Sequence, residues 1–434
     1  MTLSYADAVG ALTERGRFGI SMGLERVERL MAEVGHPERR LRGALIGGTN
    51  GKGSVVAMTR SVLNAAGLRV GSMPKPHLVS YRERVAIDGE PISADAFAAM
   101  VERVLPAIDR VATSIGPPTE FEALTAAAIG ELARRKVDLA IVEVGMGGRL
   151  DATNVLDLGV AAITNVQRDH ESYLGSTLTK IGGEKAPIIK AGNLAVTGAT
   201  GRGLRPILER CAALDVPLRR AGRRQAYRAR LLASDWGGIT VEARTPLRRL
   251  EDLRIGLLGA HQAENAAVAL GVIEAIAERW NIIVTDDAIR TGMAAARWPG
   301  RLEVLDGGPH GRVLLDGAHN PAGAAALAAA LADLGVQRPL IAFGAMRGKK
   351  VRAVLRALAP LDPRFIFTRV DDPKAFAPEA LAAAWRAVSG QPSLTASNAT
   401  EALTMAYADP VVVAGSLYLV GEVRGILTGT SDDA

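Results

Sequence analysis

The residues best suited to chemistry stand in one short glycine-rich segment, Gly47-Gly48-Thr49-Asn50-Gly51-Lys52-Gly53-Ser54. Glycines let backbone N–H groups converge on an anion without interference from a Cβ atom. Lys52 can reach the outer phosphates of a nucleotide, and the hydroxyl of Ser54 can hold Mg²⁺. We interpret the segment as a phosphate-binding loop, although Gly53 separates the lysine from the serine and departs from the usual spacing. The alternative is a tight turn before a helix.

Two further positions could supply metal ligands. Glu143 lies near the end of the almost purely apolar segment 137–144, and a carboxylate buried there would require a cation. The alternative is a strand end open to solvent. Asp169-His170 follows another apolar segment, and an imidazole in this place can ligate a metal ion. A surface histidine is an equally good interpretation of His170 alone.

The elements that must position these residues alternate between apolar strands and helices. Residues 44–46 form an expected strand, the glycine loop follows, and a helical pattern opens at Ser54. In open α/β sheets, ligands bind at the carboxyl ends of the parallel strands, which is where the loop and Glu143 fall. The sequence predicts an α/β fold: a P-loop-type, mostly parallel sheet domain followed by a smaller Rossmann-like α/β domain.

The boundary between the two domains is expected after residue 296. The segment Arg297-Trp298-Pro299-Gly300-Arg301 breaks a helical pattern, so we predict domains at 1–296 and 297–434. Residues 203–258 are arginine-rich, and we expect irregular structure there, with weak β alternation around 238–241.

Composition narrows the class of protein. The 434 residues are 48% hydrophobic, carry a net charge of +6 and include a single cysteine, Cys211, so a disulfide framework is excluded and a reducing cytoplasm is expected. The N-terminus lacks the pattern of a signal peptide, and no apolar stretch is long enough to span a membrane. Because the arginines are scattered, we expect anionic small molecules rather than nucleic acid as partners. We also expect a monomer.

The ordered motifs resemble those of the folylpolyglutamate synthase/dihydrofolate synthase family of Mur-type ligases. The resemblance runs from about residue 20 to Tyr418 and rests on the following segments: 48–54, Pro76-His77-Leu78, 143–154, Asp169-His170, Glu184-Lys185-Ala186, His261-Gln262, Asn265-Ala266-Ala267, Trp298-Pro299-Gly300-Arg301 and 316–321. It implies an ATP-dependent ligase that joins L-glutamate to dihydropteroate, to the γ-carboxylate of folates, or to both, through an acyl phosphate.

The resemblance also implies residue roles. Lys52, Lys185, Arg301 and His319 would be catalytic, with His319 near the incoming glutamate. ATP would be bound by Asn50, Gly51, Lys52, Gly53, Ser54, Asn265, Arg301 and Asp316. The Mg²⁺ positions would be Ser54, Glu143, His170 and Lys185, the last being the lysine that this family carbamylates. The acceptor would be bound by Ser21, Met22, Gly23, Thr119, Glu120, Phe121, Glu122, Leu150, Asp151 and Ala152.

Departures from the family pattern leave the acceptor open. The family usually has a serine that ligates Mg²⁺ before Pro76-His77, and this chain has Lys75, a cation that cannot ligate a metal while it is charged. We expect Lys75 to stand at the mouth of the phosphate site and to leave one Mg²⁺, held by Glu143 and His170. Glu120 also replaces an expected aromatic residue. An amide ligase for a non-folate acid and a nucleotide-binding protein without catalysis are the alternatives.

Overall fold

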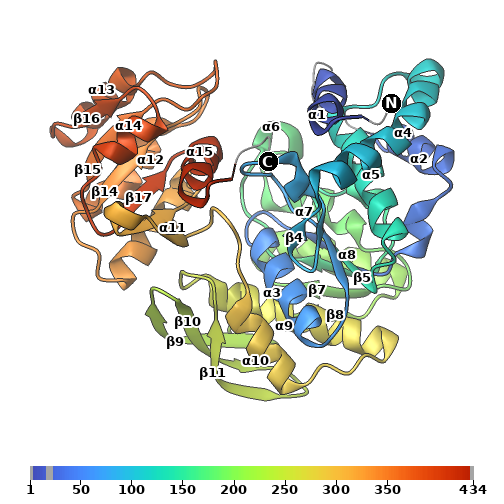
Figure 1. Cartoon of the computed structure of the whole chain (residues 1–434). Coiled ribbons are helices and arrows are strands. Elements are labelled where there is room, and N and C mark those ends of the chain that lie inside the picture. The colour runs from blue at the N-terminus through green and yellow to red at the C-terminus, as the bar shows by residue number, and fades with distance from the viewer. Residues whose placement is uncertain (1–2, 16–22, 431–434) are drawn as a thin grey trace.

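The computed structural model describes residues 3–15 and 23–430 as two α/β lobes built on sheets of eight and six strands, with a separate three-stranded sheet below them (Figure 1). The fold is the predicted α/β class. The predicted boundary after residue 296 falls between a helix of the larger lobe and the first strand of the smaller sheet, and the division into 1–296 and 297–434 stays a prediction.

The eight-stranded sheet of the larger lobe is mostly parallel. Its strands are, in spatial order, β4 (Glu90–Pro91), β3 (Ala86–Ile87), β2 (Val70–Met73), β5 (Leu139–Glu143), β1 (Gly43–Gly47), β6 (Gly159–Ile163), β7 (Leu194–Thr197) and β8 (Leu218–Arg220). Among the described strands of this sheet, the antiparallel pairings are β2–β3 and β3–β4, so β3 runs against the others. Strand β1 lies between β5 and β6. The chain passes from β1 to β2 on one side of β1 and from β5 to β6 on the other, so the strand order reverses here. Ligands of open α/β sheets usually bind at such a point.

Helices cover both faces of this sheet. Successive strand residues point to opposite sides, and because the central strands are apolar almost throughout, both faces must be buried. Leu45 of β1 enters one buried cluster, and its neighbours Ala44 and Ile46 enter the other. The first cluster is formed with α1 (Tyr5–Thr13), α2 (Glu25–Glu33), α4 (Ala94–Ile115), α5 (Glu120–Arg134), α6 (Glu171–Leu174), α7 (Leu178–Lys185) and α8 (Gly201–Leu214). The second is formed with α3 (Lys52–Ala65), α9 (Gln262–Trp280) and α10 (Asp286–Ala295).

The expectation of irregular structure over 203–258 was wrong. The segment completes helix α8 and strand β8 and then forms an antiparallel sheet of β9 (Arg228–Asp235), β10 (Gly238–Arg244) and β11 (Arg249–Ile255). One face of this sheet is buried through Ile239, Val241 and Leu253, which pack into the second cluster beside α9. The arginines lie mainly on the other face, where several of them pair with Glu242.

The smaller lobe has its own sheet and two buried clusters. Its strands are, in spatial order, β12 (Glu303–Asp306), β13 (Arg312–Leu315), β17 (Val411–Ala414), β14 (Leu340–Phe343), β15 (Arg364–Thr368) and β16 (Leu394–Ala396), parallel except for the pair β12–β13. Helices α11 (Pro321–Asp333), α12 (Val351–Leu358) and α13 (Pro378–Ser389) cover one face, and α14 (Ala399–Thr404) and α15 (Leu417–Thr428) cover the other.

Short 3₁₀ helices span Pro37–Arg40, Tyr81–Arg84, Ala152–Val155, Ala186–Ile188, Gly308–His310 and Ala359–Leu361. Among the described residues, no helix combines the length and apolar character needed to cross a membrane.

Candidate active site

The glycine loop joins β1 to α3 and requires its glycines. Gly51 is the N-cap of α3 and has φ of +79°, a backbone conformation that residues with a side chain rarely adopt. A Cβ at Gly51 would collide with the amide of Asn265, and one at Gly53 would collide with the ring of Trp298. The loop therefore presents its backbone N–H groups at a helix N-terminus, which is the arrangement that binds phosphate.

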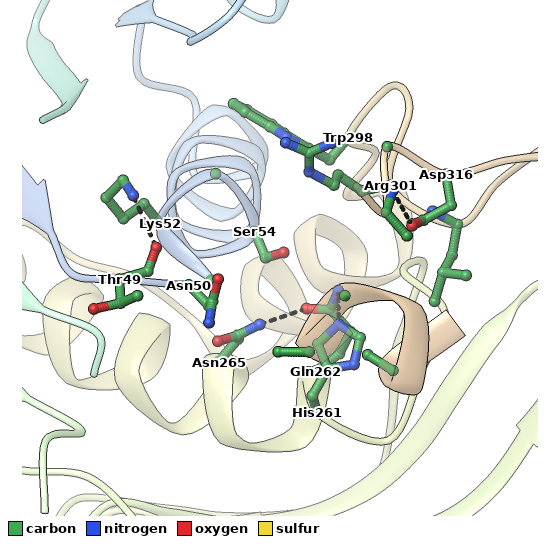
Figure 2. A pocket seen from close by; sticks show the side chains of 18 of the residues that line it. Thr49, Asn50, Lys52, Ser54, His261, Gln262, Asn265, Trp298, Arg301 and Asp316 are labelled. Carbon is green, nitrogen blue, oxygen red and sulfur yellow. Dashed lines mark hydrogen bonds between the residues drawn. The ribbon is translucent and has the colours of Figure 1, made fainter. Parts of the chain in front are cut away.

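Two lysines converge on the loop from opposite sides. Lys52 Nζ donates to the carbonyl oxygens of Gly48 at 3.2 Å and Thr49 at 3.1 Å, and Lys185 Nζ donates to the same Gly48 oxygen at 3.0 Å. Figure 2 shows Lys52 turned back along the loop. Burial, with the nearby charge of Lys52, lowers the pKa of Lys185 to about 8. The neutral form of this amine is therefore easier to reach than that of an exposed lysine.

A cavity of about 460 Å³ lies between the glycine loop, the start of α9 and the smaller lobe. Its lining includes Asn50, Gly51, Lys52, Gly53, Ser54, Lys75, Glu143, His261, Gln262, Asn265, Trp298, Arg301, Asp316 and His319. In Figure 2 the hydroxyl of Ser54 lies between Asn265 and Arg301. The structure thus brings all the sequence-predicted nucleotide residues to one cavity.

The smaller lobe contributes a buried carboxylate and a guanidinium. Asp316 is 9% exposed and accepts hydrogen bonds from the backbone N–H groups of Leu302 and Ala318, both at 2.9 Å. Burial raises the pKa of Asp316, and the neighbouring charge of Arg301 opposes that shift. These bonds hold the Arg301 turn against the loop after β13, so both residues face the cavity (Figure 2).

Glu143 enters the same cavity from the end of β5. Its side chain is buried, and its Oε2 atom has no hydrogen-bond partner in the described structure. Burial raises the pKa of Glu143, while Lys52, Lys75 and Arg301 oppose the shift. A buried oxygen without a partner is costly, so this position fits a cation ligand.

Lys75 follows β2 and lines the cavity beside Glu143. Its Nζ atom is buried without a hydrogen-bond partner in the described structure and lies 4.2 Å from the centre of the Phe121 ring. Burial lowers the pKa of Lys75 to about 8, and the charges of Asp151 and Glu143 oppose the shift. The sequence led us to expect Lys75 at the mouth of the phosphate site, but nothing in the sequence showed that its ammonium would be buried.

His170 is not brought into this cavity. It is the N-cap of α6 with about half of its side chain exposed, and its Nε2 atom lies 3.7 Å from Oδ2 of Asp169. Among the described residues, no three histidine, cysteine or acidic side chains lie close enough together to hold a metal ion. The assignment of His170 and Lys185 to a metal site stays a prediction.

The residues predicted for the acceptor form a neighbouring region, and several have structural partners. Thr119 and Glu122 make a capping box at the start of α5, and Glu122 also accepts two hydrogen bonds from Arg26. Glu120 accepts a 2.8 Å bond from the hydroxyl of Tyr81. Asp151 caps the 3₁₀ helix that begins at Ala152, and Leu150 precedes it. Gly23 is described, whereas Ser21 and Met22 lie outside the described residues.

Sequence reasoning gave no role to several lining residues, among them His261, Gln262 and Trp298. Gln262 accepts a 2.9 Å hydrogen bond from Asn265 and so fixes the amide that faces Gly51. Trp298 packs against Gly53. Their motifs, His261-Gln262 and Trp298-Pro299-Gly300-Arg301, were the available signals. His319 lines the cavity and lies 2.8 Å from the Gly317 carbonyl through Nδ1.

A phosphate-binding loop that faces an arginine and a buried aspartate of a second α/β lobe across one cavity defines an ATP-dependent ligase of the Mur type. In agreement, residues 95–273 match the Mur ligase middle domain and residues 300–417 match the Mur ligase glutamate ligase domain. The Bacillus subtilis dihydrofolate synthase/folylpolyglutamate synthase is 36% identical over 382 residues, which are 86% of this chain and 87% of that protein. The chain belongs to the folylpolyglutamate synthase/dihydrofolate synthase family.

Solved structures agree over nearly the whole chain. The Mycobacterium tuberculosis folylpolyglutamate synthase in complex with ADP and AMPPCP has a TM-score of 0.86 at 33% identity and covers 97% of this chain and 99% of that one. The Escherichia coli FolC in complex with DHPP and ADP has a TM-score of 0.84 at 28% identity, with 97% and 98% of the two chains covered.

Proposed function

We propose that this protein joins L-glutamate to dihydropteroate, to the γ-carboxylate of folates, or to both, with cleavage of ATP to ADP and phosphate. The observation that carries the proposal is the single cavity in which the glycine loop, Glu143, Arg301 and Asp316 meet. A relative that is 36% identical to this chain bears both activities in its name.

The reaction would proceed in two balanced steps. One oxygen of the acceptor carboxylate would form a bond to the γ-phosphorus of ATP, and the bond to the β–γ bridging oxygen would break, its electron pair leaving with ADP. The amine of L-glutamate would then attack the acyl carbon, lose a proton, and expel phosphate. Arg301 and the loop N–H groups would neutralise charge on the phosphoryl group in flight.

Residues of both lobes would bind ATP. We place the phosphates on the loop from Asn50 to Ser54, with Asn265, Arg301 and Asp316 completing the site from α9 and the smaller lobe. Closure of the cavity would exclude water from the acyl phosphate. His319, on the loop that leads into α11, would face the incoming glutamate. This arrangement is consistent with a division of the chain into working domains 1–296 and 297–434.

The cavity also fits Mg²⁺. The unpartnered Oε2 of Glu143 and the hydroxyl of Ser54 are oxygen donors of the kind that this ion prefers, and both line the cavity. When bound, Mg²⁺ would neutralise phosphate charge. We keep His170 and Lys185 as candidate ligands and expect one ion rather than two, because Lys75 places an ammonium where a serine ligand usually stands. The lowered pKa of Lys185 favours the neutral amine that carbamylation needs.

The acceptor is assigned to the region beside Lys75 and Phe121. Gly23, Thr119, Glu120, Phe121, Leu150, Asp151 and Ala152 are the described candidates, with Ser21, Met22 and Glu122. Phe121 offers an aromatic face for a flat ring system. We expect a monomer, which light scattering of the purified protein would establish.

ADP release tests the proposal. Sustained ADP release should require both L-glutamate and an acceptor, and we expect turnover with dihydropteroate, with a tetrahydrofolate monoglutamate, or with both. ADP release with a non-folate carboxylic acid and with neither folate acceptor would favour the alternative of a related amide ligase.

A further inference from the structure

Lys75 and Glu143 are two buried opposite charges that are not paired with each other. Both line the cavity, and both end in an atom without a hydrogen-bond partner in the described structure, Nζ and Oε2. No salt bridge joins Lys75 to Glu143 or to Asp151 among the described residues. An anionic oxygen of a bound ligand would give the Lys75 ammonium a partner, and a bound cation would give the Glu143 carboxylate one.

Packing alone does not account for a lysine here. Contact with the Phe121 ring at 4.2 Å gives a cation–π interaction, which recovers only part of what a buried ammonium loses when it leaves water. All three donors of Lys75 are unused, whereas the other lysine of the cavity, Lys52, already donates to two carbonyl groups. Lys75 is therefore the lysine of this cavity that is free to bind an anion.

Its position separates that anion from the nucleotide phosphates. Lys75 leaves the end of β2, and β5 lies between β2 and the strand that carries the glycine loop. The ammonium lies over Phe121, whose helix α5 opens the region assigned to the acceptor. The group expected between the phosphate site and that region is the carboxylate that attacks the γ-phosphate.

We propose that the ammonium of Lys75 binds the carboxylate of the acceptor acid and holds it against the γ-phosphate, so that Lys75 is a catalytic and specificity-determining residue. The inference rests on the proposed function. Lys75 would offset the repulsion between two anions as the new O–P bond forms, and it would then donate to the oxygen that bridges the acyl group and phosphorus. No proton transfer by Lys75 is required.

The test compares a charged ligand with an uncharged one. Binding of pteroic acid and of its primary carboxamide would be measured by titration calorimetry for the unmodified protein, for Lys75→Met and for Lys180→Met. Methionine keeps the contact with Phe121 and removes the charge. Lys180 is exposed and serves as the matched control. Binding of AMPPCP reports whether the fold and the phosphate site are intact.

The unmodified protein and Lys180→Met should prefer the acid over the carboxamide by about 100-fold, the range expected for a desolvated charge contact, and Lys75→Met should lose most of that preference. AMPPCP affinity should change less than about threefold, and methylammonium should partly restore ADP release to Lys75→Ala. An unchanged preference in Lys75→Met would overturn the inference, as would a loss confined to AMPPCP. If the unmodified protein binds neither ligand and releases no ADP, the proposed function fails instead.

Discussion

Several charged side chains of the cavity are held in place by hydrogen bonds to the backbone, whereas the Nζ atom of Lys75 has no such partner in the described structure. Lys52 and Lys185 share the Gly48 carbonyl, and Asp316 takes two N–H groups beside the Arg301 turn. A backbone partner leaves the charge of each group available to a ligand. The cavity can therefore gather several cations around a triphosphate without a pre-formed salt bridge that would have to break.

Replacement of Lys52 by alanine should abolish ligation without unfolding the protein. The ammonium bonds only to loop carbonyls in the absence of nucleotide, so its loss removes little from the folded state. We expect ADP release to fall by about 100-fold or more, as for other removed charge-stabilising groups. Steady-state kinetics would be paired with thermal unfolding. Near-normal turnover in Lys52→Ala would reject the assignment of the phosphate site.

Glu143→Gln should raise stability and lower activity at the same time. The carboxylate is 6% exposed with one oxygen unpartnered, and a neutral amide in its place avoids the cost of a buried charge. We expect a gain of about 1 kcal/mol in the free energy of unfolding, measured in denaturant with a chelator present, together with a large loss of ADP release. A less stable variant would show that the hydrogen bond from the backbone N–H of Lys75 stabilises the Glu143 carboxylate by more than its burial costs.

The nucleotide-site residues could be predicted from the sequence, whereas the surroundings of Lys75 and His170 could not. The nucleotide residues from Asn50 to Ser54, with Asn265, Arg301 and Asp316, were expected at one site, and they line one cavity. The burial of Lys75 against Phe121 was not expected, because it depends on how β2 and α5 pack. His170 could not be placed from its position after an apolar segment, since the direction of a side chain in a loop depends on tertiary contacts.

At the scale of elements, the two ends of helix α3 offer a matched pair of glycines. Both have positive φ, +79° at Gly51 and +84° at Gly67, but only Gly51 faces another side chain, Asn265, while Gly67 has open space. Gly51→Ala should displace the loop and weaken ADP binding by at least about tenfold, whereas Gly67→Ala should cost about 1 kcal/mol of stability and leave ADP affinity unchanged. Equal ADP affinities in both variants would contradict the close-approach role of Gly51.

The sequence predicted some elements well and others poorly for identifiable reasons. Strands β1, β5, β6 and β7 are buried on both faces, so their apolar runs are unmistakable. The sheet of β9 to β11 has one solvated face rich in arginine, and a register shift between Val241 and Ala243 interrupts its alternation with β11. A pattern of period two is hard to recognise when a bulge breaks it.

At the scale of the whole molecule, the three-stranded sheet reaches the smaller lobe. Trp236, at the turn between β9 and β10, packs against a buried cluster of that lobe, and the guanidinium of Arg312 lies 4.3 Å from its ring centre. This contact lies outside the cavity and joins the sheet of β9 to β11 to the smaller lobe, in addition to the packing of Leu78 against α15. We expect the Trp236 contact to stabilise the relative position of the two lobes that brings Arg301 to the glycine loop.

Trp236→Ala should weaken the coupling of the lobes without touching the cavity. We expect kcat/KM for L-glutamate to fall between about twofold and tenfold, in line with a cation–π contact and some apolar burial. Leu247, 72% exposed at the other hairpin of the same sheet, provides the control substitution Leu247→Ala, which should have no effect. Equal kinetics for the two variants would show that the Trp236 contact does not support the site.

We expect the enzyme to transfer the γ-phosphate of ATP to the acceptor carboxylate before L-glutamate is joined. The most direct measurement follows oxygen from an acceptor labelled with ¹⁸O in both carboxylate positions. Mass spectrometry of the released phosphate should find one ¹⁸O atom for each amide formed, because the oxygen that bridges carbon and phosphorus leaves with phosphorus. Amide formation with unlabelled phosphate would contradict the transfer of the γ-phosphate to the acceptor carboxylate.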